Sequence, residues 1–165
     1  MLYYAKEREL ENSPCEVEVF AEETASIVRP RLEKPPVERV CDFAAELKDT
    51  VFDIDEDQLR SALVNILENA VDACRDNTEQ SSPRIVFRVY PDSNDGVSEI
   101  EDNGIGMSAE VQSQIFTLFF SSKSTEGTGI GLFITHKIIH QHGGKISVTS
   151  EPGNGSLFCV PIPRG

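Results

Sequence analysis

The sequence predicts an α+β sandwich in which helices cover one face of a mixed sheet. Strand-like and helix-like segments are interleaved along the 165 residues without the strict alternation of a parallel α/β protein. Two segments, 55–76 and 129–142, carry the three- and four-residue apolar spacing of amphipathic helices, whereas the other apolar runs are short enough for strands. The length suits one compact domain with its own core.

The first third of the chain is predicted to hold a short strand, a helix and a hairpin. Residues 1–8 have the character of the frayed end of a longer helix. A helix is expected near Phe20 to Leu32, ended by the pair Pro35-Pro36. Two strands joined by a hairpin turn follow: Val40 to Leu47, the turn Lys48-Asp49, and Thr50 to Ile54.

Residues 55–76 hold the strongest helical pattern in the chain. The apolar positions cover one broad face: Leu59, Ala62, Leu63, Ile66, Leu67, Ala70, Val71 and Cys74. Polar residues at steps of four, three and four form a stripe opposite that face: Asn65, Asn69, Asp72 and Asp76.

The second half is predicted to hold a hairpin, a short helix, a long loop, a second good helix and two strands. The hairpin consists of the strands Arg84 to Tyr90 and Val97 to Asp102, joined by the turn Pro91 to Gly96. A short helix follows from a Ser108 cap to Ile115, and then the loop 116–128. The second good helix runs from Gly129 to His142, and the last strands are Lys145 to Thr149 and Leu157 to Pro161. Gly143-Gly144 is the predicted stop of the last helix.

Composition and charge argue against several classes of protein. The net charge of −13 disfavours a nucleic-acid surface, which needs a basic patch. No apolar run approaches the length of a membrane-spanning helix and the N-terminus has no apolar signal core, so we expect no direct membrane contact. The four cysteines lack C-x-x-C spacing, which favours free thiols in a reducing cytoplasm.

Two asparagines one turn apart in the middle of a helix need an explanation, because asparagine is a poor helix former. An Asn-rich solvent face is one explanation for Asn65, Asn69 and Asp72. The other is a side-chain carbonyl donated to Mg²⁺, which prefers oxygen ligands and takes the rest from water and phosphate.

Two glycine-rich segments are further candidate binding elements. The run 102–106 (DNGIG), at a strand end, is either turn chemistry or a place where a flat ligand approaches the backbone and Asp102 accepts a hydrogen bond from an amine such as adenine N6. The run 127–132 (GTGIGL) opens a helix, which is a ready phosphate site. It is neither the P-loop G-x-x-x-x-G-K-[ST] nor the dinucleotide G-x-G-x-x-G.

In order and spacing, these three segments resemble the N, G1 and G2 boxes of the superfamily of gyrase B, heat-shock protein 90, MutL and the histidine kinases. Residues 115–123 (IFTLFFSSK) resemble the F box of histidine kinases, and 142–146 and 153–158 are similar to their C-terminal segments. The resemblance spans 38–163. It implies a two-layer α/β sandwich with a mixed sheet of about five strands backed by three helices, the Bergerat-type ATP-binding fold. Residues 11–165 would form this domain, and 1–10 would end an upstream dimerisation helix.

The resemblance also implies the ligands ATP and Mg²⁺ and the residues that bind them. Asn69 would hold Mg²⁺, Asn65 would lie near the phosphates and Asp102 would accept from the adenine amine. Residues 107–126 would form a lid over ATP, in which Lys123 either reaches a phosphate or is solvated. The implied ATP-binding set is Asn65, Asn69, Asp72, Ala73, Asp102, Gly104, Ile105, Gly106, Phe119, Lys123, Gly127, Thr128, Gly129, Ile130, Gly131 and Leu132.

Within that superfamily the residues favour a kinase over an efficient ATPase. Hydrolytic members place a glutamate one turn before the Mg²⁺ asparagine, where this chain has Asn65, and an amide cannot act as a general base. None of the histidines, at 136, 140 and 142, lies in an acceptor motif. We therefore expect transfer of the ATP γ-phosphate to a histidine on upstream dimerisation helices.

The implied partners are those phosphoacceptor helices and a response regulator receiver domain. The chain alone is expected to be a monomer, and the full protein a homodimer that is cytoplasmic or has a membrane anchor. Asp72-Ala73, where many histidine kinases carry Lys and an aromatic, resembles the nitrogen-regulation type. The alternatives are an anti-sigma-factor-type serine kinase of the same superfamily and a nucleotide-binding docking module without catalysis.

Overall fold

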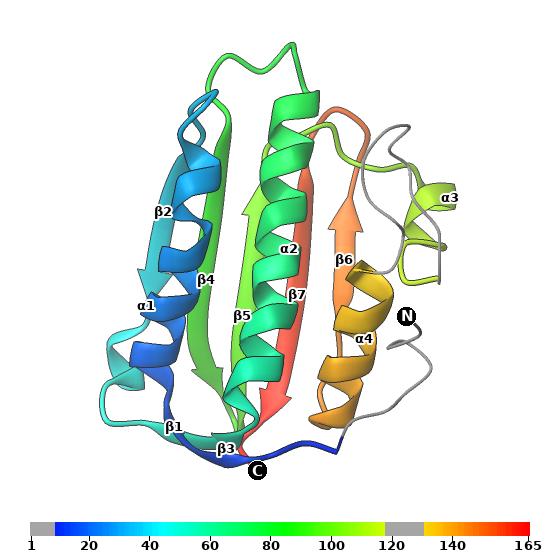
Figure 1. Ribbon diagram of the computed structural model, residues 1–165. Helices are drawn as coiled ribbons and strands as arrows, with labels where there is room; N and C mark the ends of the chain where they lie inside the picture. The colour runs from blue at the N-terminus through cyan, green and yellow to red at the C-terminus, as the bar shows by residue number, and fades with distance from the viewer. Residues whose placement is uncertain (1–8, 118–130) are drawn as a thin grey trace.

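The computed structural model, which describes residues 9–117 and 131–165, confirms the predicted α+β sandwich (Figure 1). Its main sheet has the strand order β2-β4-β5-β7-β6. The strands are β2 (Glu38–Phe43), β4 (Arg84–Asp92), β5 (Asp95–Asp102), β6 (Ser147–Ser150) and β7 (Ser156–Pro163). The sheet is mixed, since β2 runs parallel to β4 while the pairs β4–β5, β5–β7 and β6–β7 are antiparallel.

Three helices lie side by side on one face of this sheet: α1 (Val17–Val28), α2 (Glu56–Asp76) and α4 (Gly131–Gln141) (Figure 1). The central helix α2 begins at an Asp55 cap, whose carboxylate accepts a hydrogen bond from the Gln58 N–H at 3.2 Å. All the apolar positions predicted for its core face are buried. The helix therefore turns its asparagine stripe away from the sheet, as the periodicity predicts.

The predicted hairpin between residues 40–47 and 50–54 is wrong. The chain leaves β2 at Phe43 and forms a short 3-10 helix, η3 (Ala45–Leu47), because this turn buries Leu47 in the core. The next strand, β3 (Val51–Ile54), instead pairs antiparallel with β1 (Ser13–Glu16) in a separate two-stranded ribbon. The pairing partners are non-local in sequence, so no turn signal reveals them.

The first helix is also displaced from its predicted range. α1 begins at Val17 and ends at Val28, and Pro30 lies in a following 3-10 turn, η2 (Arg29–Leu32). Proline lacks an N–H and its ring collides with the carbonyl four residues earlier, so the α-helix cannot continue through it. Pro30, rather than the later Pro35-Pro36 pair, therefore sets the end of this helix.

The remaining elements lie within a few residues of their predicted places. The β4–β5 hairpin is confirmed with a tighter turn, in which Ser93 takes a φ of 58°. Ser108 caps the expected helix, but α3 (Ala109–Gln112) ends before Ile115. At the end of α4, Gly143 has a φ of 77° and Gly144 donates to the Ile139 carbonyl at 3.0 Å, which is the predicted glycine stop.

Across the described ranges 9–117 and 131–165, we find no helix with the length and apolar character needed to cross a membrane.

Substitution of Phe87 by alanine tests the core. Phe87 is fully buried on β4. Its ring packs edge-to-face with the ring of Phe43, and the two ring centroids are 5.4 Å apart. Phe87→Ala should lower the free energy of unfolding by about 3–5 kcal/mol, because it leaves a cavity under the helices. Urea denaturation measures it. Val19→Ala, at an exposed position of α1, is the control and should change stability by less than about 0.5 kcal/mol. A similar small effect for Phe87→Ala would contradict the packing.

Candidate nucleotide-binding site

The asparagine stripe of α2 is held in place by α4. The Asn65 Nδ2 group donates a hydrogen bond to the Thr135 hydroxyl at 3.1 Å, and Asn69 Nδ2 donates to the Asn65 backbone carbonyl at 2.8 Å. At such a residue, a hard cation would bind the carboxamide oxygen. Both side chains are partly buried, so a plain solvent face does not explain them.

Glycine at position 131 allows the N-terminus of α4 to approach that stripe. A Cβ atom built on Gly131 would lie 2.7 Å from Asn65 Oδ1 and 2.8 Å from its Nδ2. The first turn of α4 therefore lies directly against the amide of Asn65. Because a helix N-terminus presents free N–H groups and a positive dipole end, an anion held by the stripe would also meet α4. Leu132, the next residue, is half-buried and packs against the core.

The carboxylate of Asp102 is buried at the end of β5, with only 5% of the residue exposed. Its Oδ1 accepts the Gly104 N–H at 2.8 Å. Burial raises the pKa of Asp102 from 3.8 to about 6; the backbone N–H groups of Gly104 and Ser156 lower the pKa and nearby Glu101 raises it. Within residues 9–117 and 131–165, no Lys or Arg forms an ion pair with this carboxylate. A desolvated carboxylate of this kind is a functional-site candidate, because its burial is costly unless a ligand uses it.

The backbone after Asp102 lies close against α2. The Ile105 N–H donates to the Ala73 carbonyl at 3.1 Å, and a Cβ atom on Gly104 would lie 2.4 Å from the Ala73 carbonyl carbon. Gly106 has a φ of 69°, and a Cβ there would lie 1.9 Å from the Glu151 carbonyl oxygen. These two glycines are thus required for the chain path itself.

Two side chains fix this turn: Asn103, which belongs to the run 102–106, and Asn77, which the sequence did not single out. Asn103 Oδ1 accepts the Arg84 N–H at 2.8 Å, and Asn103 Nδ2 donates to the Ser82 carbonyl at 2.8 Å. Asn77 Nδ2 donates to the carbonyls of Asn103 and Gly104 at 3.3 and 3.1 Å. Asn103 lies in the turn that the run 102–106 predicts, whereas the partners of Asn77 lie 26 and 27 positions away, so no local pattern marks Asn77.

Asp72 lies beside a cation that the sequence did not predict. The Arg31 guanidinium from η2 contacts Asp72 Oδ1 at 2.6 Å and Glu68 Oε2 at 3.3 Å. Asp72 and Glu68 are thereby drawn into one charged cluster at the edge of the asparagine stripe.

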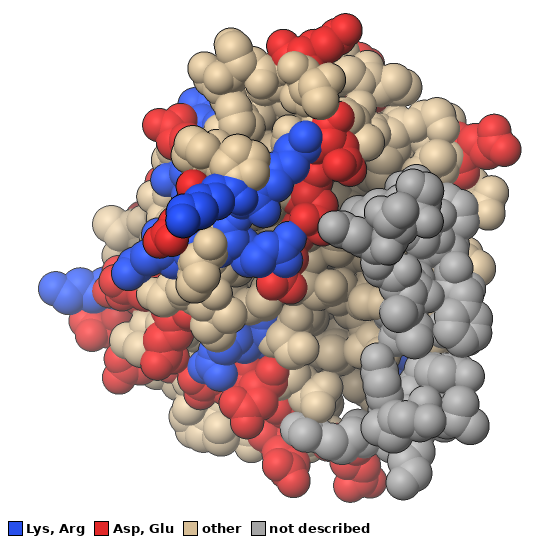
Figure 2. All heavy atoms as spheres, turned by 45° about the horizontal axis from the view of Figure 1, so that its top comes forward, with Lys and Arg blue, Asp and Glu red and all other residues tan. Residues whose placement is uncertain are grey.

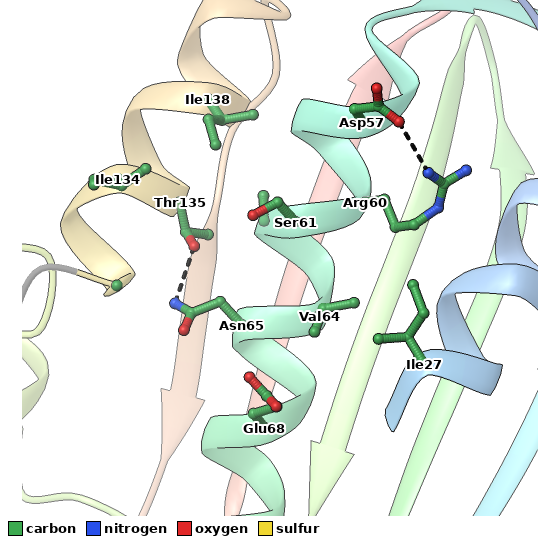
Figure 3. Close-up of a pocket in the computed structure, with 12 residues that line it drawn as sticks. Ile27, Asp57, Arg60, Ser61, Val64, Asn65, Glu68, Ile134, Thr135 and Ile138 are labelled. Carbon is green, nitrogen blue, oxygen red and sulfur yellow. Dashed lines mark hydrogen bonds and ion pairs between the residues drawn. The ribbon is translucent and has the colours of Figure 1, made fainter. Parts of the chain in front are cut away.

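A groove of about 480 Å³ runs along the outer face of α2 between α1 and α4, and Asn65, Thr135 and Gly131 lie in its wall (Figure 3). Ile27 of α1, Val64 of α2 and Ile134 and Ile138 of α4 supply apolar surface, while Asp57, Arg60, Ser61 and Glu68 supply polar surface. An extended or helical segment lying in this groove would pass the asparagine stripe.

The remaining members of the predicted set lie outside the described residues: Phe119, Lys123, Gly127, Thr128, Gly129 and Ile130. Ile105, between Gly104 and Gly106 in the same turn, has an exposed side chain. Over residues 9–117 and 131–165, no group of three or more His, Cys, Asp or Glu side chains could hold a metal. A cation bound at Asn69 would thus complete its shell with phosphate and water, as Mg²⁺ commonly does.

The three histidines of α4 and its C-terminal turn make contacts within the fold. His142 Nε2 accepts the Asp55 N–H at 3.1 Å, which ties the end of α4 to the start of α2. His136 and His140 are exposed and stack on each other, with ring centroids 6.4 Å apart. Phe116 packs against His136.

The chain resembles known proteins in sequence and in fold. A family model described as "Histidine kinase-, DNA gyrase B-, and HSP90-like ATPase" matches residues 54–165. The signal transduction histidine-protein kinase AtoS of Escherichia coli K12 is 34% identical over 165 residues, which cover 99% of this chain and 26% of AtoS. The sensor histidine kinase ZraS of Klebsiella oxytoca is 39% identical over 109 residues, which cover 66% of this chain and 22% of ZraS. The chain thus spans about a quarter of the length of these relatives.

Solved structures show the same fold. Full-length ShkA in complex with AMPPNP superposes with a TM-score of 0.81 and 24% identity, over 94% of this chain and 32% of ShkA. The nucleotide-free catalytic domain of histidine kinase ThkA superposes with a TM-score of 0.80 and 24% identity, over 94% of this chain and 97% of that domain.

Replacing Asp102 with asparagine should stabilise the protein in a pH-dependent manner. The folded-state pKa of Asp102, about 6, lies above the ordinary aspartate value of 3.8, so the stability contributed by the bound proton is present at low pH and is lost as the pH rises through 6. Asp102→Asn cannot ionise. Its free energy of unfolding relative to wild type should therefore rise by about 2–3 kcal/mol between pH 4 and pH 8, measured by paired urea denaturation. A difference that does not change with pH would contradict the buried carboxylate.

Proposed function

Because the chain belongs to the histidine kinase-, DNA gyrase B- and HSP90-like ATPase family, we propose that it is the ATP-binding catalytic domain of a two-component sensor histidine kinase. The observation that carries the proposal is the buried carboxylate of Asp102 in a glycine turn against α2. A carboxylate there can accept a hydrogen bond from an exocyclic amine such as adenine N6. Among the similar proteins, AtoS is by name a signal transduction histidine-protein kinase and ZraS a sensor histidine kinase.

The described residues fit Mg·ATP. Asp102 would accept from adenine N6, with Gly104, Ile105, Gly106 and Ala73 around the base. Asn69 would give its carboxamide oxygen to Mg²⁺, and Asn65 and the first turn of α4, with Gly131 and Leu132, would face the phosphates. Bound Mg²⁺ would neutralise charge on the β- and γ-phosphate oxygens.

The chemistry that fits this site is phosphoryl transfer rather than hydrolysis. Position 65 holds an amide, which cannot take a proton from water. A neutral imidazole needs no such base to attack. Its nitrogen lone pair forms a bond to the γ-phosphorus, the bond from that phosphorus to the bridging oxygen breaks, and the electron pair leaves with ADP; the imidazole proton passes to solvent. The protein contributes positioning and charge stabilisation.

The acceptor histidine is proposed to lie on upstream dimerisation helices, of which 1–10 would be the end. His142 is engaged with Asp55, and His136 and His140 lie on the flank of α4 with Phe116. The phosphate would pass from the acceptor to a response regulator receiver domain. The full protein would act as a homodimer on the cytoplasmic side, with this chain itself monomeric.

Nucleotide binding is tested by calorimetric titration of Mg·ADP into the wild-type chain and into Asp102→Asn. The wild type should bind, and the variant should bind about tenfold or more weakly, because one charge-assisted hydrogen bond worth about 1.5–3 kcal/mol is lost. The pH-dependent gain in stability expected for the same variant serves as the folding control. Equal affinities for the two proteins would remove Asp102 from the site, and no wild-type binding at all would contradict the proposal.

Transfer is tested with radiolabelled ATP. The chain alone should not label itself, whereas adding helices that carry the acceptor histidine from the same protein should give an acid-labile, alkali-stable phosphoryl group on those helices. Acid-stable phosphate on a serine of a partner would favour the serine kinase alternative. Binding without any transfer would favour a docking module.

A further inference from the structure

Arg31 bridges two carboxylates at the edge of the proposed phosphate site. It comes from η2, outside the residues matched by the family model, and its terminal nitrogens contact Glu68 at 3.3 Å and Asp72 at 2.6 Å. About 40% of the Arg31 side chain is exposed, against 18% for Asp72. The guanidinium therefore covers the carboxylate of Asp72, while it remains accessible to solvent and to a ligand.

The helix places each of these carboxylates next to one of the asparagines. Glu68 lies three residues after Asn65, and Asp72 three residues after Asn69. Residues at that spacing are neighbours on a helix surface, with Cβ atoms about 5–6 Å apart. Figure 3 shows Glu68 one turn beyond Asn65 along the same side of α2. Two bare carboxylates here would repel a triphosphate held by Asn65 and Asn69.

Hydrogen bonds hold the backbone of η2 at a position from which the Arg31 side chain reaches Glu68 and Asp72. The Arg31 carbonyl accepts a hydrogen bond from Arg75 Nη2 of α2, and the same Arg75 nitrogen donates to the Pro35 carbonyl at 3.2 Å. The Val37 N–H closes the segment with a 2.9 Å bond to the Leu32 carbonyl. Lys and Arg side chains form a band next to Asp and Glu side chains on this end of the molecule (Figure 2). In a chain of net charge −13, such a band is a local exception.

We propose that Arg31 is a positioning residue for the triphosphate of Mg·ATP, which acts by offsetting the charges of Glu68 and Asp72 beside the asparagine stripe. The inference rests on the proposed function, because it concerns the phosphate end of the same site. It assigns to η2, a segment without a nucleotide-binding motif, the task of making an acidic helix face compatible with an anionic ligand.

The test compares Mg·ATP with adenosine, which lacks the phosphates, by calorimetry on three proteins. Arg31→Gln should weaken Mg·ATP binding by about three- to tenfold at low salt and leave adenosine binding unchanged, since a partly exposed charge is screened. The double variant Arg31→Gln/Glu68→Gln restores the net charge of the cluster, so its affinity for Mg·ATP should return to within about twofold of wild type. Raising the salt concentration should shrink the difference between Arg31→Gln and wild type.

Arg88→Gln is the matched control. Arg88 also bridges two carboxylates, Glu99 at 3.4 Å and Glu101 at 2.5 Å, but it projects from β4 on the face of the sheet without helices. It should not change the discrimination between Mg·ATP and adenosine. Equal weakening of both ligands by Arg31→Gln, unchanged Mg·ATP binding, or failure of the double variant to recover would each overturn the inference. Failure of the wild type to bind Mg·ATP would instead overturn the proposed function.

Discussion

The burial of α2 against the sheet is the interaction on which the rest of the structure depends. Ile66, Leu67 and Val71 are completely excluded from water, and each contributes about 1.5–3 kcal/mol of hydrophobic stabilisation. Because this face fixes the rotation of the helix, it also fixes the opposite face. The glycine turn at 104–106 is built on the Ala73 carbonyl, α4 begins against Asn65, and η2 reaches Asp72. One packed helix thereby sets the relative positions of all the described parts of the site.

Several features of the site are locally unfavourable and are tolerated only because the core supports them. Asparagines in mid-helix lower helix propensity, a carboxylate is buried at the end of β5, and Gly106 follows a backbone path closed to other residues. Natural sequences depart from local consistency mainly where function requires it. These departures fall within residues 65–106, on the C-terminal half of α2 and the adjoining end of β5, which is the pattern of a binding site rather than of a weak fold.

The sequence revealed the parts of the molecule that are encoded locally. The apolar face of α2, the Ser108 cap and the glycine stop after α4 each follow from spacings of one to four residues, and each is confirmed. The hairpin predicted after residue 40 is wrong, because β3 pairs with β1 and not with β2, the strand that precedes it in sequence. Arg31 was missed for the same reason: its partners lie 37 and 41 positions away, and no periodicity connects them. Of the predicted ligands, those between 118 and 130 lie outside the described residues, while the binding roles of Asn65, Asp102 and Gly131 stay predictions.

The strand order has a consequence for how the chain is made. β7, the last element, lies between β5 and β6, so the sheet remains split until residues 156–163 are available. A ribosome holds the most recently made residues in its exit tunnel. While β7 is still in the tunnel, β6 has no strand to pair with in the main sheet. During synthesis the sheet can be completed only after residues 156–163 have left the tunnel. A truncation before Ser156 would remove an interior strand of the sheet.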